Sequence, residues 1–536
     1  MLSLVLSLSL TLGACAVAGD EDLAVLTARA EALRAEVESL RRAAGAYGLR
    51  INGEEVPPVA MMRSFVYLYG TKYLERKIRD FLVADELEFR RKAGNPLENL
   101  VVGTAEVAKE IDDLRGQLAE RNPGKDPDAL FRLLGFTLDE LWSDQESWRL
   151  FDKVFLPDEP DEWPESTRQA LASAGGQQFV DQIVDGLKKA KEADPTAPMP
   201  PFYRQLFRQW IQKELRKVSN VKMASGGIPP EIVLAVNDWT LPTEEAFRSV
   251  SPLVTPYDRE RVLAWLLWTT ATRQALKGEG AYASDEEFAV AFEEHEGPYK
   301  DSPLNIEMVA TAFKKFPSYE LYKEHFRIRK SYEKKIESEI TDEALRSHLD
   351  RVRDFLGGGR VDAQVILLSA RDWNDWSWKG PDAFEAARTR ADEVMAALQK
   401  GESFEALLDR YSEFWTPAPG DPSQPQQQPQ PNGGRFGLQE KNNLRTLLGE
   451  TEFDTVLRGY SIADLLFHDT KVGEIVGPLR GPFGYYVARV VAKVPGHRGI
   501  DLAQENQRQL VREDYVNQRL LDWSNGVITK SSVELR

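Results

Sequence analysis

A short pattern near the start of this 536-residue chain returns later in the sequence. Residues 49–57 place an Asn52-Gly53 pair between two extended pieces and end in Pro57. Asn237 and Pro242 lie at an offset of 185 residues from Asn52 and Pro57 (237 − 52 and 242 − 57). Asn-Gly and Asn-Asp pairs are typical of tight turns. The pattern therefore predicts that a strand, a turn and a second strand open two copies of one structural unit.

The residues that follow each turn have the period of an amphipathic helix. At the same offset Ile78, Phe81 and Leu82 fall on Leu263, Leu266 and Leu267. Residues 136–142 resemble residues 316–322, at an offset of 180 (316 − 136), which a small deletion would explain. Chance similarity is the alternative, and the common order of the landmarks argues against it. We expect helical units over 47–160 and 233–356, a helical connector over 161–232, and a loop at the proline-rich residues 194–201.

Composition limits the class of protein and of partner. A hydrophobic content of 42% can fill several cores, and the length exceeds what one core usually serves, so several domains are expected. The net charge of −17 would repel nucleic acid and anionic lipid, and no basic stripe interrupts it. The five histidines lie far apart in the sequence and are interpreted as surface or capping residues. No ligand spacing for a metal and no phosphate loop or dinucleotide fingerprint is present, so we expect no metal and no cofactor.

The first residues are predicted to direct export. An apolar run from Met1 ends at Cys15, the single cysteine of the chain, and Leu12-Gly13-Ala14-Cys15 resembles a bacterial lipobox in which the cysteine is lipidated. The run is too short to span a membrane and fits a signal segment over 1–18. Ordinary cleavage beside residues 16–18, and a buried N-terminal element, remain alternatives. An amphipathic helix is expected over 20–46, because leucine and valine recur there at spacings of three and four.

Six landmarks follow one another over 360–495. They are an extended run at 361–368, a helix at 383–399, Gly401 followed by Phe404 and Leu407, Tyr411-Ser412-Glu413, Gly433-Gly434-Arg435-Phe436-Gly437, and a closing stretch at 478–494 with Phe483-Gly484-Tyr485. In this order they resemble the parvulin type of peptidyl-prolyl isomerase, also called PpiC. The resemblance implies a four-stranded antiparallel sheet with surrounding helices.

The same resemblance implies which residues would form a proline pocket. Active members of the family have histidines in the first and last strands and a Cys or Asp after the serine-containing turn, and these positions carry Val365, Tyr486 and Phe414 here. Tyr486 is the candidate catalytic residue, because its hydroxyl can donate a hydrogen bond. The candidate substrate-binding residues are Phe453, Leu448, Phe436, Phe483, Val365 and Phe414.

Three further segments lie within or after this domain. Residues 416–432 are rich in Gln and Pro and predict a solvated, polyproline-like insertion. Trp373, Trp376 and Trp378 would form either an aromatic patch for unfolded chains or a packing surface for the neighbouring helical unit. Residues 496–536 predict a helix and a strand, with Val527-Ile528 and 533–535 extended.

The helical units resemble the N-terminal segment of periplasmic chaperones of the SurA and PpiD type. The likeness implies that the C-terminal helix and strand return to complete the N-terminal unit. We therefore expect an α+β multidomain protein, exported to the periplasm or cell envelope and anchored through Cys15 if that residue is lipidated. It would bind unfolded or proline-containing polypeptides as a chaperone, with isomerase activity weak or lost. An active peptidyl-prolyl isomerase and a structural envelope lipoprotein are the alternatives.

Overall fold

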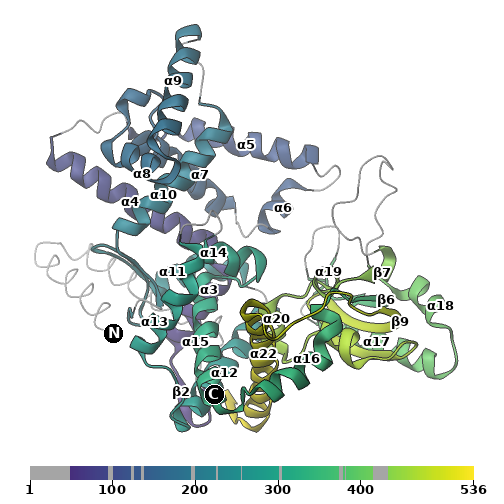
Figure 1. Cartoon of the computed structure of the whole chain (residues 1–536). Helices are drawn as coiled ribbons and strands as arrows, with labels where there is room; N and C mark the ends of the chain where they lie inside the picture. The colour runs from purple at the N-terminus through teal and green to yellow at the C-terminus, as the bar shows by residue number, and fades with distance from the viewer. Residues whose placement is uncertain are drawn as a thin grey trace, which may run out of the picture.

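Most of the chain is helical, and the largest sheet has four antiparallel strands (Figure 1). The computed structural model describes residues 49–535 apart from 95–99, 122–125, 134–137, 195–198, 225–226, 255, 301–304, 373–377, 381 and 415–431. The predictions for the signal segment, Cys15, the helix over 20–46 and nearly all of the Gln/Pro-rich insertion lie outside the described residues. The predicted α+β multidomain class is confirmed.

Both predicted hairpins form, and two helices follow each of them. Asn52 and Asn237 occupy the turns with the same φ of 52°, a left-handed conformation that asparagine tolerates. The first hairpin and its helices are β1 (Leu49–Ile51), β2 (Glu54–Val56), α3 (Pro58–Tyr69) and α4 (Thr71–Lys92). The second are β4 (Ile232–Val236), β5 (Trp239–Pro242), α11 (Thr243–Val250) and α12 (Pro256–Gly278). The short strand β3 (Val221–Lys222) pairs with β4.

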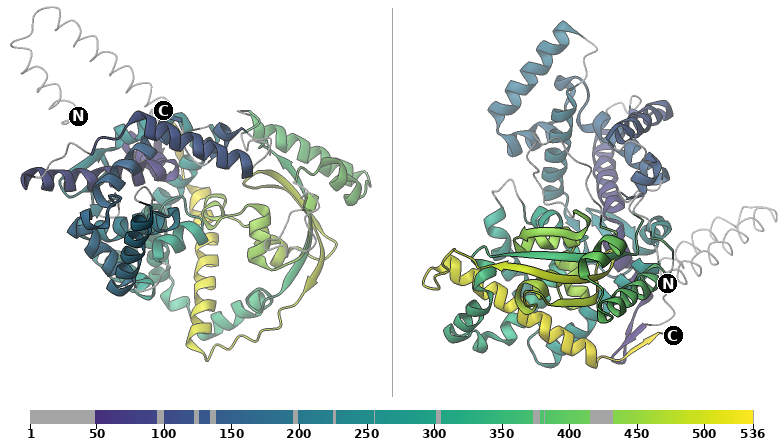
Figure 2. Two further views of the ribbon diagram at one scale, coloured as in Figure 1. Left: turned by 90° about the horizontal axis from the view of Figure 1, so that it is seen from above. Right: turned by 90° about the vertical axis from the view of Figure 1, so that its right-hand side faces the viewer.

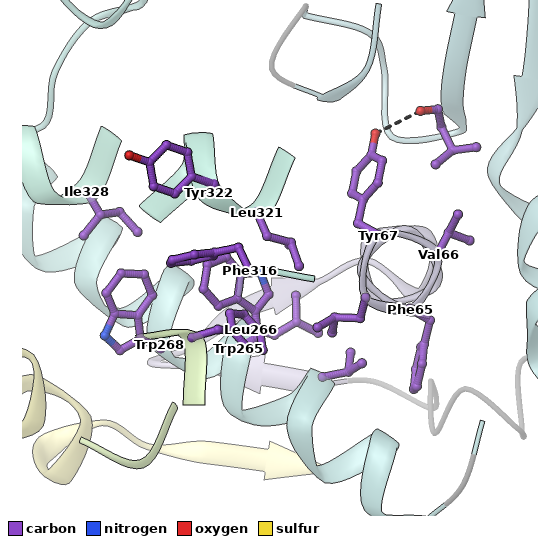
Figure 3. Packing of buried hydrophobic residues seen from close by; sticks show 14 of the residues in the cluster. Phe65, Val66, Tyr67, Trp265, Leu266, Trp268, Phe316, Leu321, Tyr322 and Ile328 are labelled. Atoms are coloured by element: carbon purple, nitrogen blue, oxygen red, sulfur yellow. Dashed lines mark hydrogen bonds between the residues drawn. The ribbon is translucent and has the colours of Figure 1, made fainter. Parts of the chain in front are cut away.

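The two copies pack against each other through α3 and α11. The rings of Phe65 and Phe247 lie 5.5 Å apart, and the Tyr67 hydroxyl donates a hydrogen bond of 2.9 Å to the Val233 carbonyl (Figure 3). A Cβ on Gly70 would lie 2.7 Å from the Val250 side chain, so the close approach of the helices requires glycine there. Trp265, Trp268 and Phe316 continue this core toward α15 (Tyr319–Lys335), and we refer to it as the cradle core.

A second helical lobe extends from the end of α4 (top of Figure 1; Figure 2, right). It contains α5 (Thr104–Arg121), α6 (Pro127–Leu133), α7 (Leu138–Phe155), α8 (Glu165–Gly175), α9 (Gln177–Ala193) and α10 (Pro201–Val218). Arg79 of α4 is 2% exposed and donates to Asp144 at 2.6 Å and to Ser147 at 2.8 Å. Its guanidinium also lies 3.9 Å from the ring centre of Trp148, so one buried cation joins α4 to α7.

The end of the chain returns to its beginning. Helix α22 (Glu505–Lys530) buries Val516 and Leu520 in the cradle core, and β10 (Val533–Leu535) pairs antiparallel with β1. The C-terminal return that the resemblance implied is therefore confirmed. Val527 and Ile528 were predicted to be extended, but they continue α22 and pack against the cradle core. Within the described residues, no helix combines the length and apolar character that a membrane span needs.

The four-stranded sheet has the strand order β7-β6-β9-β8 and forms a separate domain at the right of Figure 1. Its strands are β6 (Arg360–Ser369), β7 (Arg435–Gln439), β8 (Ile475–Arg480) and β9 (Gly484–Val494). Helices α17 (Ala383–Gln399) and α18 (Phe404–Tyr411) cover one face. Helices α19 (Lys441–Leu448) and α21 (Ile462–Asp464) cover the other. Helix α16 (Asp342–Leu356), capped by the Thr341 side chain, leads into β6.

Candidate peptide-binding site

Tyr486 lies near the start of β9, with Leu367 of β6 on one side and Leu479 of β8 on the other. Successive residues of a strand point to opposite faces of a sheet. Tyr486, Ala488 and Val490 therefore face α19 and α21, and Val487 faces α17. The strand thus directs the candidate catalytic residue into the core beneath α19.

The structure brings most of the predicted site residues together in this core. Tyr486, Val365, Leu448, Phe436 and Phe414 belong to one buried cluster, and Phe483 packs against it. The Phe414 ring lies 5.2 Å from that of Phe436 and 6.1 Å from that of Tyr486. We refer to these six residues as the pocket cluster. Its five buried members are at most 6% exposed.

The pocket cluster is filled by its own side chains. The Tyr486 hydroxyl donates a hydrogen bond of 3.0 Å to the Leu448 carbonyl, and burial raises the pKa of Tyr486 well above its usual value. A Cβ on Gly481 would lie 2.1 Å from the Tyr486 ring, and a Cβ on Gly449 would lie 2.2 Å from the Phe483 ring. The rings of Tyr486 and Phe483 thus pack directly against the backbone of Gly481 and Gly449. The one polar group of the candidate catalytic residue is satisfied within the protein.

Phe453 does not join the pocket cluster. It opens α20 (Glu452–Arg458), is fully buried, and packs in the cradle core. Its ring lies 5.2 Å from that of Trp265 and 5.7 Å from that of Phe316. The predicted apolar shelf for a proline ring is therefore divided between two cores.

Ion pairs on α20 reinforce this attachment to the cradle core. Lys314 pairs with Glu452 at 3.0 Å, and Arg261 pairs with Asp454 at 3.0 Å. Burial acts to raise the pKa of Glu452, but the charges of Lys314 and neighbouring cations outweigh it, and the pKa lies below its ordinary value. Helix α20 is thus bound to the helical units by the residues directly before and after Phe453.

Two further contacts join the sheet domain to the helical units. Trp378 lies 4.3 Å from Tyr257 between ring centres, and Phe384 of α17 stacks on the same tyrosine at 4.7 Å. Arg480 of β8 pairs with Glu260 of α12 at 2.6 Å. For Trp378 the structure supports the alternative of packing against the neighbouring helical unit. Trp373 and Trp376 lie outside the described residues.

Sequence reasoning missed one polar residue beside the pocket cluster. Glu450 accepts hydrogen bonds from the backbone of Ile462 and Ala463, both at 2.9 Å, and from the Ser461 hydroxyl at 3.2 Å. It also pairs with Arg458 at 2.5 Å. A buried carboxylate with four donors holds the segment after Leu448 in place, and no spacing in the sequence marks it.

The interpretation of the histidines as surface or capping residues is wrong for two of them. His325 is 5% exposed, and its ring is stacked on that of Trp268 (5.6 Å between ring centres) and tilted against that of Phe316 (5.2 Å). His348 is buried and contacts Asp514 at 2.8 Å. Burial lowers the pKa of His325 to about 4, with Lys314 and Arg329 acting in the same direction and Glu452 opposing them.

His325 should make stability depend on pH. Below its ordinary pKa of 6.5 the unfolded chain binds a proton that the folded chain does not bind until about pH 4. The contribution of His325 to the free energy of unfolding is therefore largest at about pH 7 and above. It decreases by about 2 kcal/mol between pH 7 and pH 5. Replacing His325 with phenylalanine keeps the ring stack and should remove this part of the slope. Urea unfolding of both proteins at pH 7 and pH 5 measures it, and equal slopes would contradict the assignment.

Comparison with known proteins identifies the sheet domain. Residues 383–499 match the family model of the PPIC-type PPIASE domain. Three solved structures are similar to the chain. The peptidylprolyl isomerase PrsA of Bacillus anthracis is 16% identical, with 49% of this chain and 94% of that chain covered and a TM-score of 0.19. PrsA of Bacillus subtilis is 17% identical, with 54% and 89% covered and a TM-score of 0.16. The foldase protein PrsA of Streptococcus pneumoniae is 16% identical, with 55% and 93% covered and a TM-score of 0.17. No curated protein sequence matches the chain.

Proposed function

Because the chain contains a PPIC-type domain of the parvulin kind, we propose that it is a folding factor that binds unfolded or proline-containing polypeptides as a chaperone, with little or no isomerase turnover. The observation that carries the proposal is the filled pocket cluster. Tyr486 is fully buried and its hydroxyl is bonded to the Leu448 carbonyl, so neither the ring nor the donor is available to a substrate prolyl bond.

The other residues at the family's pocket positions also argue against catalysis of prolyl isomerisation. Rotation about a prolyl bond needs relief of a barrier of about 20 kcal/mol by an apolar shelf and polar groups beside the carbonyl. Here Val365 and Phe414 supply no polar side-chain group, and Phe453 packs against Trp265 instead of a ligand. A chaperone role requires only apolar surface that an unfolded chain can reach.

Such surface is present on the second helical lobe. Phe89 at the end of α4 is 67% exposed, and Phe202 at the start of α10 is 70% exposed. Phe179 of α9 is also partly exposed and contacts Trp210. Burying such exposed apolar rings against an apolar segment of an unfolded chain is favourable. We assign client binding to this lobe.

We further propose that the protein is exported and attached to the cell envelope through a lipidated Cys15, as the sequence predicts.

Two assays on the purified protein test the function. The cis-to-trans rate of proline tetrapeptides should equal the uncatalysed rate when an active parvulin run beside it gives acceleration. Acceleration by this protein would establish the isomerase and remove the proposal that the filled pocket is inactive.

The second assay follows the aggregation of a denatured client by light scattering. The protein should suppress aggregation, and the double substitution Phe89→Ser and Phe202→Ser should reduce that suppression severalfold, because it removes two exposed rings without touching a core. A control with Val290→Ser and Val472→Ser also removes two exposed apolar side chains, on α13 (Asp285–Glu296) and beside β8, and should suppress as the unaltered protein does. Absence of suppression by the unaltered protein would favour a structural envelope protein.

A further inference from the structure

A cavity of about 320 Å³ lies where the helical units, α20 and the C-terminal helix meet. Its walls come from α13, α15, α20 and α22, and it is distinct from the pocket cluster. Tyr299, Tyr322 and Phe326 supply aromatic surface, and His295 stacks on Phe326 with 4.6 Å between ring centres. A cavity of this size that combines aromatic walls with a few polar groups has the character of a small-molecule site.

Arg329, a cation in the cavity wall, forms neither an ion pair nor a hydrogen bond with the residues that the structure describes. Among the residues that the structure describes, no carboxylate forms an ion pair with Arg329 and no acceptor takes a hydrogen bond from its guanidinium, and its Nε is buried. The other cation of the wall, Lys314, is already paired with Glu452. The charge of Arg329 acts on Glu333, whose pKa it helps to lower, but no acceptor in the described part of the chain meets its N–H donors. Partly buried donors without an acceptor are unfavourable, and a carboxylate bound in bidentate fashion would satisfy two of them.

The remaining polar groups limit which carboxylate would fit. His295 shares a hydrogen bond of 2.7 Å with the Tyr322 hydroxyl, and burial together with Arg329 and Lys314 lowers its pKa to about 4, so it adds no charge at neutral pH. Glu294 and Glu513 also line the cavity, and both are exposed at its rim. These carboxylates would repel a ligand with several negative charges, and they would attract an ammonium group next to the bound carboxylate.

We propose that this cavity binds the α-carboxylate of an amino-acid residue with an apolar side chain, the carboxylate on Arg329 and the side chain against Tyr299, Tyr322 and Phe326. Two sources share this chemistry, a free amino acid and the C-terminal residue of a peptide. The rim carboxylates discriminate between them, because only the free amino acid carries an ammonium group beside its carboxylate. The inference does not depend on the chaperone function.

Calorimetric titration of the purified full chain tests the proposal with three probes: L-phenylalanine, N-acetyl-L-phenylalanine and L-phenylalanine amide. L-Phenylalanine or N-acetyl-L-phenylalanine, the two probes with a carboxylate, should bind. L-Phenylalanine amide should bind at least about tenfold more weakly than the tighter of them. Tighter binding of L-phenylalanine identifies a free amino acid as the ligand. Equal or tighter binding of the acetylated form identifies a peptide C-terminus. The proposal is overturned if neither L-phenylalanine nor N-acetyl-L-phenylalanine gives heat of binding, or if the amide binds with equal affinity.

Variants assign the binding to the cavity. Arg329→Gln should weaken carboxylate binding at least about tenfold, and Arg329→Lys, which keeps the charge without the fork of donors, should weaken it less. Arg351→Gln, an exposed arginine on α16, is the matched control and should bind as the unaltered protein does. Circular dichroism shows whether each variant is folded. Unchanged affinity in a folded Arg329→Gln variant would overturn the assignment.

Discussion

Replacing Phe453 with alanine is expected to lower the free energy of unfolding by about 3–5 kcal/mol. The ring is fully buried between Trp265 and Phe316, and the rigid helices around it would close the resulting cavity only in part. Arg261 also lies 5.4 Å from the ring centre, so the variant loses a cation–π contact as well. Urea unfolding followed by circular dichroism measures the change.

A second phenylalanine supplies the control for this prediction. Phe313 is 64% exposed, and Phe313→Ala should change the free energy of unfolding by less than about 0.5 kcal/mol. If Phe453 instead formed a shelf for substrate, its alanine variant would be nearly as stable as the unaltered protein and would lose affinity for proline peptides. That result would contradict the division of the predicted shelf between two cores.

The attachment of α20 has a consequence for the whole molecule. Glu452, Phe453 and Asp454 are consecutive residues, and each of them contacts the helical units. Loss of any one of these contacts should therefore loosen the sheet domain from the helical units. Helix α20 thus joins the sheet domain to the helical units.

Local signals in the sequence, together with the resemblance, predicted the first strand and the first helix of the sheet domain. The helix predicted over 383–399 forms over Ala383–Gln399, and the run at 361–368 lies within β6. Turn residues and hydrophobic period act over a few residues, so one sequence carries them. The pairing of β10 with β1 joins the two ends of the described chain and was predicted only through the resemblance to a known architecture.

The sequence alone did not show into which of two neighbouring cores a side chain would pack. Helix α20 has apolar neighbours on two sides, and no local pattern shows that Phe453 turns to Trp265 and away from Tyr486. Helix α15 presents the same difficulty, because it buries His325 and Glu333 on a helix whose composition is strongly charged. Burial of these residues depends on α12 and α22, which lie far away in the sequence.

Replacing Glu450 with alanine is expected to destabilise the sheet domain by about 3–5 kcal/mol. The Glu450 side chain has no exposed surface, and its loss would leave the Arg458 guanidinium and the backbone N–H groups of Ile462 and Ala463 without their acceptor. These groups hold the segment that follows Leu448, whose carbonyl accepts the Tyr486 hydrogen bond.

Two further variants separate the buried network from a general effect of lost charge. Glu450→Gln keeps an amide oxygen as an acceptor but not the charge opposite Arg458, so its loss of stability should be intermediate. Glu440→Ala removes an exposed carboxylate before α19 and should change stability by less than about 0.5 kcal/mol. Equal urea midpoints for Glu450→Ala and Glu440→Ala would show that the carboxylate does not support the pocket cluster. The expected order would make one buried residue decisive for the closed pocket, because Glu450 accepts from Arg458 and from the α21 backbone and lies two residues after Leu448, whose carbonyl accepts the Tyr486 hydrogen bond.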